Sequence, residues 1–388
     1  MTSALRIQER HAPAAPSFDE PDFSSQFAGL RVLIAHDWIV LWAGAEHCVQ
    51  QLLHVFPEAD LVVGVMGDGM RPRNEVTERA RETWLGRLPG ARRRHRWFLP
   101  LEGLAFASLD TRGYDLVISS SHAFAKAVRA RNGGVHMSYC YSPPRYLWDL
   151  REMYQRDATG LQRVAMHLGT GPLRAFDRRS ARGVDHFVSI SQYVSHRIGR
   201  CYGRDSTVIY PPVEPKPLDG PPGPREDFLL YLGRLVPYKR VDLAIMAAEQ
   251  LGVKLVIAGE GPDRHRLEHL AKRHVEFLGP VSETEAGQLL ERCRAFVFPG
   301  EEDFGIAPVE ANAHGAPVIG YAGGGLLETM IPGVTAELFD RQQVADVAAA
   351  IERACAHHWD ESALRANARR FSAERYRRQI ADFVRDRL

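Results

Sequence analysis

The sequence predicts an α/β protein with two parallel-sheet domains. Its 388 residues favour two packed cores over one. In both halves, short apolar and β-branched runs alternate with amphipathic stretches, the pattern of parallel strands joined by helices. A proline-rich passage that begins at Tyr210 and runs on to Pro224 lies between the halves. Prolines at this density disfavour both helix and central strand, so this passage is expected to be a linker.

The expected strands follow from these apolar runs. In the first half they are residues 30–35, 61–65, 116–119 and 186–190. In the second half they are residues 228–233, 254–259, 275–279, 295–299 and 316–320, and each of these ends in Gly or Pro. Ligands of open α/β sheets bind beyond the carboxyl ends of the strands. The loops after the strands are therefore expected to carry the functional site.

Five segments are expected along the chain: a loose tail at 1–28, a first domain at 29–209, a linker at 210–225, a second domain at 226–370 and a terminal helix at 371–388. The tail is rich in proline and acidic residues. In the terminal segment Tyr376, Ile380, Phe383 and Val384 recur at helical spacing, which predicts an apolar face packed back on the first domain.

Composition excludes several classes of protein. Hydrophobic residues make up 45% and charged residues 25% of the chain, as in an average globular protein, and the formal net charge of +1 argues against a nucleic-acid coat. The five cysteines lie far apart without a C-x-x-C pair, which argues against a disulfide framework or zinc site and favours a reducing compartment. No apolar run approaches the roughly 18 residues of a membrane span. We therefore expect a cytoplasmic protein.

Two carboxylates eight positions apart, Glu302 and Glu310, are the most informative local feature. An apolar run that ends at Pro299 is expected to be a buried strand, and Pro308 fits the first turn of the helix that follows. Free amides at the start of that helix, flanked by two acceptors, suit a polyhydroxylated ligand. In the alternative interpretation, Glu302 caps the helix and Glu310 faces solvent.

Motifs in both halves resemble glycosyltransferase family 4, whose members have the GT-B fold. In the second half the segments are 233–242, 258–263, 302–310 and 323–328, which follow the order of the family. In the first half, segments 35–38, 114–123, 143–149 and 202–213 are similar to a subgroup that contains bacterial O-antigen and exopolysaccharide mannosyltransferases. The resemblance covers residues 30 to 388 and implies two Rossmann-like domains that face each other across a cleft.

For the second domain, the resemblance implies the donor-binding residues. Arg234 and Lys239 would bind the diphosphate, with neighbouring Arg240 outside the site. Cations are what the chemistry requires, because the leaving diphosphate gains negative charge as the glycosidic bond breaks. Glu302 would bind hydroxyls of the sugar and Glu310 the ribose. The backbone amides expected to assist Glu302 belong to Asp303, Phe304, Gly305 and Ile306.

For the first domain, the resemblance implies a glycine-rich loop and a histidine. The family carries Gly-Gly-Ala-Glu where this chain has Ala43-Gly44-Ala45-Glu46, and Gly44 would still let amides approach the diphosphate. His122 would lie beside the donor sugar, although a structural role is the alternative. Retention of configuration is implied, and front-face substitution is preferred to double displacement because no motif places a carboxylate on the opposite face. Neither a cofactor nor a metal is expected.

The acceptor side is indicated by a basic stretch and a second motif. From Arg71 to Pro100 there are nine arginines against three glutamates, and the stretch ends in Arg92-Arg93-Arg94-His95-Arg96-Trp97. Basic residues beside aromatic ones suit an anionic membrane surface or a lipid diphosphate. A solvated helix and loop is the alternative, and no nucleic-acid-binding module is indicated. Arg145 and Trp148 are expected to contact the acceptor, with core packing and a surface ion pair as their alternative.

Together these features predict a retaining hexosyltransferase at work in the cytoplasm, peripherally on the inner face of the plasma membrane. It would move mannose from GDP-mannose to a polyprenyl-diphosphate-linked saccharide during synthesis of a bacterial surface polysaccharide. One alternative uses a UDP- or dTDP-sugar. Another is a catalytically silent subunit that only binds a nucleotide sugar, an alternative that Ala43 allows because it replaces the first glycine of the family's motif.

Overall fold

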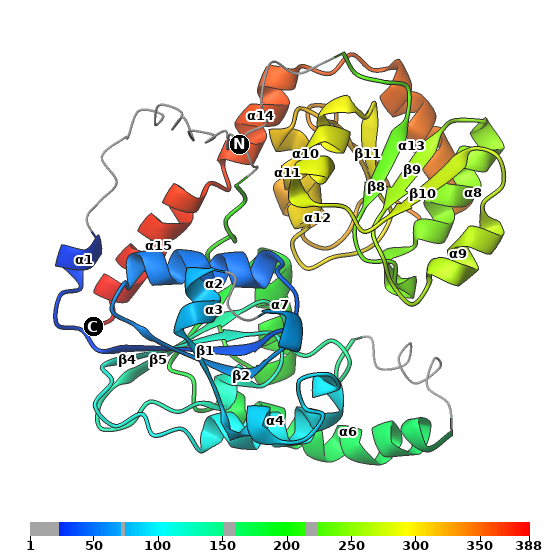
Figure 1. Cartoon of the computed structure of the whole chain (residues 1–388). Helices are drawn as coiled ribbons and strands as arrows, with labels where there is room; N and C mark the ends of the chain where they lie inside the picture. Colours follow the sequence, from blue (N-terminus) through cyan, green and yellow to red (C-terminus); the bar gives the residue numbers. More distant parts are fainter. Residues whose placement is uncertain (1–22, 71–73, 150–159, 215–223) are drawn as a thin grey trace, which may run out of the picture.

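The chain forms two α/β units that lie one above the other in Figure 1. The computed structural model describes residues 23–70, 74–149, 160–214 and 224–388. Most of the tail expected at 1–28 and the centre of the linker expected at 210–225 lie outside the described residues. A short helix, α1 (Phe23–Gln26), precedes the first sheet.

The first sheet has seven parallel strands in the order β3-β2-β1-β4-β5-β6-β7. In chain order they are β1 (Val32–Ile39), β2 (Asp60–Met66), β3 (Ala80–Glu82), β4 (Leu116–Ser121), β5 (Val135–Cys140), β6 (His186–Ser189) and β7 (Ser206–Val208). The longer helices are α2 (Gly44–Val55), α3 (Glu75–Arg79), α4 (Leu99–Ala107), α6 (Gly160–Ala181) and α7 (Gln192–Tyr202). In Figure 1, α2 lies above this sheet and α4 and α6 lie below it.

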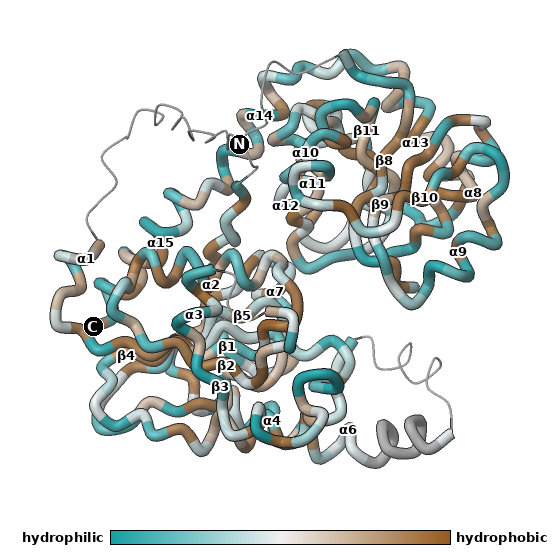
Figure 2. Tube along the Cα trace, in the orientation of Figure 1, coloured by the Kyte–Doolittle hydropathy of each residue, from teal (hydrophilic) through white to brown (hydrophobic). Residues whose placement is uncertain are grey.

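The second sheet has six parallel strands in the order β10-β9-β8-β11-β12-β13. They are β8 (Leu229–Leu232), β9 (Leu255–Ala258), β10 (Val275–Gly279), β11 (Ala295–Phe298), β12 (Val318–Tyr321) and β13 (Ala336–Phe339). The helices are α8 (Val241–Leu251), α9 (Arg264–Leu270), α10 (Glu283–Arg292), α11 (Ile306–Ala313), α12 (Leu326–Thr329), α13 (Val344–Ala356) and α14 (Glu361–Arg369). Figure 2 shows hydrophobic residues along β8, β9 and β11, at the centre of the unit.

All nine expected strands are present, with shifts of a few residues at their ends. Four strands were not expected: β3, β5, β7 and β13. The most consequential is β5, which lies inside the first sheet and pairs with β4 on one side and β6 on the other.

After the second sheet the chain returns to the first. Helix α14 packs against α11, and α15 (Ala373–Arg385) packs against α2 of the first domain. The ring of Tyr376 meets that of Tyr139 edge-on at 5.5 Å between centroids. Arg377 donates a hydrogen bond to Gln51 in α2. The last helix thereby ties the end of the second domain to the first domain.

Short 3-10 helices complete the loops that carry the candidate residues. They are η1 (Asp68–Met70), η2 (Trp84–Arg87), η3 (His95–Phe98), η4 (Ala125–Ala127) and η5 (Pro237–Lys239). All five cysteines are free thiols, and only Cys355 is not fully buried. Within the described part of the chain, no helix has both the length and the apolarity needed to span a bilayer.

Candidate functional site

The loop after β1 brings the start of α2 against the second domain. Ala43 is the N-cap residue, and its backbone N–H donates to the Glu46 carboxylate at 3.0 Å. A Cβ built on Gly44 would lie 2.1 Å from Cδ1 of Ile306, the first residue of α11. Two helix amino termini, one from each domain, therefore approach each other here, and a side chain at position 44 would displace the end of the Ile306 side chain.

A buried carboxylate shapes the loop that carries His122. Asp37, at the end of β1, accepts the backbone N–H groups of residues 122, 123, 124 and 125 at 2.6–2.9 Å. The His122 imidazole stands over it, with Nδ1 3.3 Å from Oδ2 of Asp37, and meets the Trp38 ring edge-on at 4.6 Å. Burial lowers the pKa of His122, and the Asp37 charge offsets this only in part. A mainly neutral imidazole at pH 7 follows.

In the second domain, Lys239 and Glu302 meet where two loops pack tightly. Lys239 ends η5 and Glu302 follows β11. A Cβ on Gly300 would lie 2.7 Å from Cα of Lys239, so the close approach of the two loops depends on glycine there. The Lys239 ammonium lies 3.0 Å from Oε1 of Glu302, with both side chains mostly buried. Burial works against the Lys239 charge, yet Glu302 and Tyr231 raise the pKa of Lys239 overall.

The two arginines near Lys239 have different surroundings. Arg240 donates to the carboxylate of Asp242 at 3.2–3.3 Å, so its guanidinium is turned toward the start of α8. Arg234 is exposed, and its side chain makes no hydrogen bond or ion pair among the described residues. Its role as a diphosphate ligand stays a prediction.

The segment from Asp303 to Glu310 turns the chain from β11 into α11. Gly305 is the N-cap residue with a φ of 86°, a left-handed conformation that favours glycine. Phe304 is buried against Phe371 and Tyr210, so its side chain serves the core. Glu310 lies one turn into α11. Burial, reinforced by the nearby charge of Glu283, raises the pKa of Glu310 to about 7.

Hydrogen bonds from α7 of the first domain hold this part of the second domain. The Ser191 hydroxyl donates to the carbonyl oxygen of Asp303 at 2.5 Å, and buried Arg197 lies 2.5 Å from the Asp303 carboxylate. Glu328, from α12, accepts the N–H groups of residues 192 and 193 at 2.7 and 2.8 Å. No local motif singles out Ser191 or Arg197, and Glu328, which closes the segment 323–328 of the resemblance, had no expected role.

Arg145 and Trp148, both expected to contact the acceptor, have different neighbours. Arg145 extends from the loop after β5 to the second domain, where Nη1 lies 3.6 Å from Oε2 of Glu302. The indole of Trp148 donates to Asp177 at 2.9 Å, and the guanidinium groups of Arg174 and Arg178 each lie about 5 Å from its ring centre. These contacts within the first domain favour the packing alternative for Trp148.

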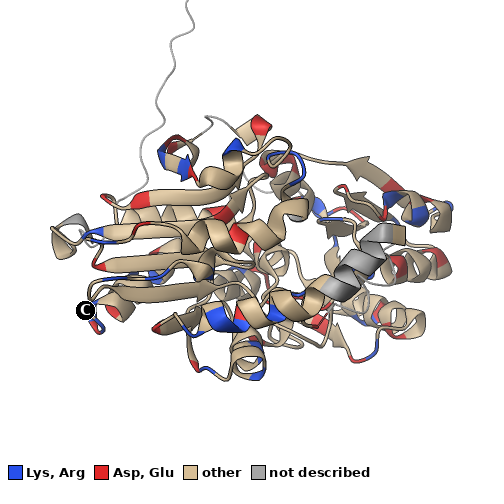
Figure 3. Cartoon of the chain, turned by 90° about the horizontal axis from the view of Figure 1, so that it is seen from below, with Lys and Arg blue, Asp and Glu red and all other residues tan. Residues whose placement is uncertain are grey.

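The basic stretch is partly neutralised by its own neighbours. Arg92 pairs with Glu82 at 2.7 Å and Arg93 with Asp68 at 3.4 Å. Trp97 is 73% exposed, and Leu101 and Leu104 of α4 are also exposed. Figure 3, which views the molecule from this lower side, shows Lys and Arg interspersed with Asp and Glu.

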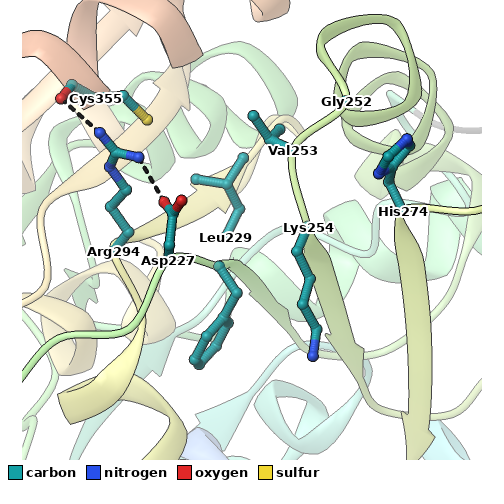
Figure 4. A pocket seen from close by; sticks show the side chains of 9 residues that line it. Asp227, Leu229, Gly252, Val253, Lys254, His274, Arg294 and Cys355 are labelled. Atoms are coloured by element: carbon teal, nitrogen blue, oxygen red, sulfur yellow. Dashed lines mark hydrogen bonds and ion pairs between the residues drawn. The ribbon is translucent and has the colours of Figure 1, made fainter.

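A cavity of about 270 Å³ lies at the amino ends of the strands of the second sheet. Its lining includes Asp227, Lys254, His274 and Arg294 (Figure 4). Each of these lies just before a strand, whereas His122, Lys239 and Glu302 lie after strands. Arg294 is paired with Asp227 at 2.5 Å and Lys254 with Glu276 at 2.9 Å. Its cations are therefore already neutralised. No cluster of three or more His, Cys, Asp or Glu side chains in the described ranges could hold a metal ion.

Solved structures with the same architecture define the fold class. HepE from Anabaena, solved in complex with UDP and glucose, superposes with a TM-score of 0.66 over 92% of this chain and 100% of its own, at 17% identity. Sucrose-phosphate synthase from Thermosynechococcus elongatus gives a TM-score of 0.69 over 92% and 98%, at 19% identity. The expected fold class, two Rossmann-like domains in the GT-B arrangement, is confirmed.

A family model matches the second domain. Residues 219–371 match the model described as glycosyl transferases group 1. A glycosyltransferase from Methanocaldococcus jannaschii, described as uncharacterized, is 27% identical over 179 residues, which are 45% of this chain and 50% of that protein. The chain thus spans half the length of this curated relative. The finer resemblance to family 4 and to mannosyltransferases stays a prediction.

Proposed function

We propose that the protein is a retaining glycosyltransferase that uses a nucleotide sugar as its donor. The observation that carries this proposal is the pair formed by Lys239 and Glu302, whose charged atoms lie 3.0 Å apart beyond the carboxyl ends of the second sheet. The amino terminus of α2 meets the second domain at Ile306, four residues after Glu302, where Ile306 lies against Gly44. A cation, a carboxylate and free amides are the groups that a sugar diphosphate requires.

In the proposed mechanism, Lys239, Arg234 and the amides near Gly44 neutralise the diphosphate. The bond between the anomeric carbon and the phosphate oxygen breaks, and the acceptor oxygen bonds to the same face of the sugar. The departing phosphate oxygen takes the proton of the acceptor. Glu302 and the amides of residues 303–306 hold the sugar hydroxyls, and neutral His122 orients the donor sugar. Glu310 binds the ribose hydroxyls.

GDP-mannose is the proposed donor, on the strength of the resemblance to mannosyltransferases alone. A UDP-sugar is the second candidate, because HepE, which has the same fold, has been solved with UDP-glucose. Both candidates place the same diphosphate on Lys239. They differ only in the base and the sugar.

The proposed acceptor is a polyprenyl-diphosphate-linked saccharide of a bacterial surface polysaccharide, reached at the inner face of the plasma membrane. Exposed Trp97, Leu101 and Leu104 beside Arg93 and Arg94 support this proposal. Aromatic and basic side chains of this kind bind at an anionic lipid surface.

A donor panel tests the proposal. Purified protein is incubated with GDP-mannose, UDP-glucose and dTDP-rhamnose without acceptor, and the released nucleotide is measured. Consumption of GDP-mannose is expected, and loss of this activity is expected in Glu302→Gln but not in the control Glu337→Gln, whose carboxylate pairs with Arg353 away from the site. Preference for another donor would replace the mannose assignment, and binding without turnover by the wild type would refute the catalytic proposal. The anomer of a transferred sugar, read by NMR, tests retention.

A further inference from the structure

Arg145 belongs to the first domain by sequence and to the donor site by position. Its guanidinium lies 3.6 Å from the Glu302 carboxylate and 3.8 Å from that of Asp303. It donates to the carbonyl oxygen of Glu301 at 3.5 Å and lies over the Tyr238 ring, 4.9 Å from the ring centre. All these partners belong to the second domain, so Arg145 joins the two domains at the donor side of the boundary.

The guanidinium is held by charge and stacking more than by hydrogen bonds. Its carboxylate contacts are longer than charge-assisted hydrogen bonds, which measure about 2.7–2.9 Å. Its Nε is buried and makes no hydrogen bond among the described residues. The side chain is only 18% exposed, so little water reaches it. The arginine therefore has an N–H donor that no described residue uses, at a site where a charged ligand is expected.

Glu302 is shared between two cations from opposite domains: Lys239 at 3.0 Å and Arg145 at 3.6 Å. The proposed function gives Lys239 another partner, the donor diphosphate. Once the ammonium turns to the diphosphate, Arg145 is the cation that remains beside Glu302. The backbone next to Glu302 is already fixed, because Ser191 and Arg197 hold Asp303 from the first domain. Only the Glu302 side chain needs a further support.

We infer that Arg145 is a positioning residue for the donor, not an acceptor contact: it holds the Glu302 carboxylate toward the sugar hydroxyls when the two domains are together. This inference rests on the proposed function, because it assigns Glu302 to the sugar. It also explains how closure of the domains completes the donor site, since the support for Glu302 comes from the other domain.

Donor hydrolysis without acceptor separates this inference from acceptor binding. Arg145→Met should lower kcat for hydrolysis by about 100-fold, as expected when a substrate-binding group is misplaced by about 1 Å. The affinity for the nucleoside diphosphate alone, measured by calorimetry, should change by less than about twofold, because the lost interaction acts on the sugar. Arg145→Lys keeps the charge but not the planar fork, and should retain intermediate activity. Arg292→Ala is the control, since it removes an exposed arginine paired with Glu226 away from the site.

Several results would overturn the inference. One is hydrolysis at the wild-type rate in Arg145→Met with transfer alone impaired, which would make Arg145 an acceptor contact. Another is a loss of nucleoside diphosphate affinity as large as the loss of kcat, which would make it a diphosphate ligand. If Arg145→Met does not fold, wild-type hydrolysis by Arg145→Lys would contradict the inference. A wild-type protein that neither binds nor consumes any donor would refute the proposed function itself, and the inference with it.

Discussion

Glu310 offers a test of the site that depends on a proton. Burial raises the pKa of this carboxyl to about 7, so close to half of the molecules carry a proton there at pH 7. Ribose hydroxyls that donate to Glu310 prefer its ionised form. Binding of a sugar nucleotide should therefore expel the proton, and the release should approach about half a proton per site at pH 7.

Calorimetry in buffers with different ionisation enthalpies measures this release directly. The observed binding enthalpy should depend on the buffer in the wild type and lose most of that dependence in Glu310→Gln. Because the variant differs only at this carboxyl, protons from the ligand cancel in the comparison. Affinity of the wild type should rise between pH 6 and pH 8. Equal proton release by the two proteins would refute the ribose-binding role.

The same pKa has a consequence for stability. A carboxyl whose pKa is higher in the folded than in the unfolded chain stabilises the fold at low pH, and this contribution is lost as the pH rises from about 4.5 to about 7. At about 1.4 kcal/mol per pKa unit, the loss is at most about 3.5 kcal/mol. Glu310→Gln should remove this pH dependence, and thermal unfolding at pH 5 and pH 8 would reveal it.

Three further predictions concern other parts of the site. Lys239→Ala should weaken binding of a nucleoside diphosphate by about 10- to 100-fold in calorimetry, as expected for a charge-assisted hydrogen bond, and unchanged affinity would exclude Lys239 as a diphosphate ligand. Gly44→Ala should lower donor hydrolysis by at most about tenfold, because the new Cβ would displace the end of the Ile306 side chain at the domain boundary, and Ile306→Ala in the same chain should restore part of it. Replacing Arg93 and Arg94 by serine should weaken pelleting with anionic vesicles by roughly fivefold per arginine without altering hydrolysis, and wild-type pelleting would contradict a membrane role.

Strands that coincide with apolar runs could be predicted from the sequence, and strands without such runs could not. Strand β5 was missed because it alternates apolar residues with His136 and Ser138, which predicts a solvated face. Both polar side chains are fully buried. His136 is accommodated because its ring nitrogens lie 2.9 Å from the Ser119 hydroxyl and 3.1 Å from the carbonyl oxygen of Gly183. A polar residue whose partner comes from another strand cannot be recognised as buried from its own segment.

The candidate site, too, could be predicted from the sequence only in part. Lys239 and Glu302 could be named from local motifs, since each follows a strand of the same sheet. The partners from the other domain could not, because Arg145 and Glu301 are 156 positions apart, and Tyr193 and Glu301 are 108 apart. Such contacts depend on how two separately folded sheets dock, which no local pattern encodes. Arg145 was accordingly assigned to the acceptor because of the domain that contains it.

Asp37 shows what holds the first-domain half of the site in place. Its two oxygens accept the amides of residues 122–125 at 2.6–2.9 Å in a fully buried position. Asp37→Asn would put an NH₂ group where one oxygen accepts two of these N–H groups. Leaving two buried donors without an acceptor should cost about 3 kcal/mol of the free energy of unfolding.

Equilibrium urea unfolding measures that cost, with Asp110→Asn as a control that removes an exposed carboxylate paired with Arg112. The control should leave the midpoint in place. Donor hydrolysis by folded Asp37→Asn should also fall, because the carboxylate 3.3 Å from Nδ1 of His122 no longer orients the imidazole. A variant with wild-type stability and wild-type hydrolysis would mean that the loop keeps its shape without the carboxylate. His122 would then owe its position to Trp38, whose ring it meets edge-on at 4.6 Å.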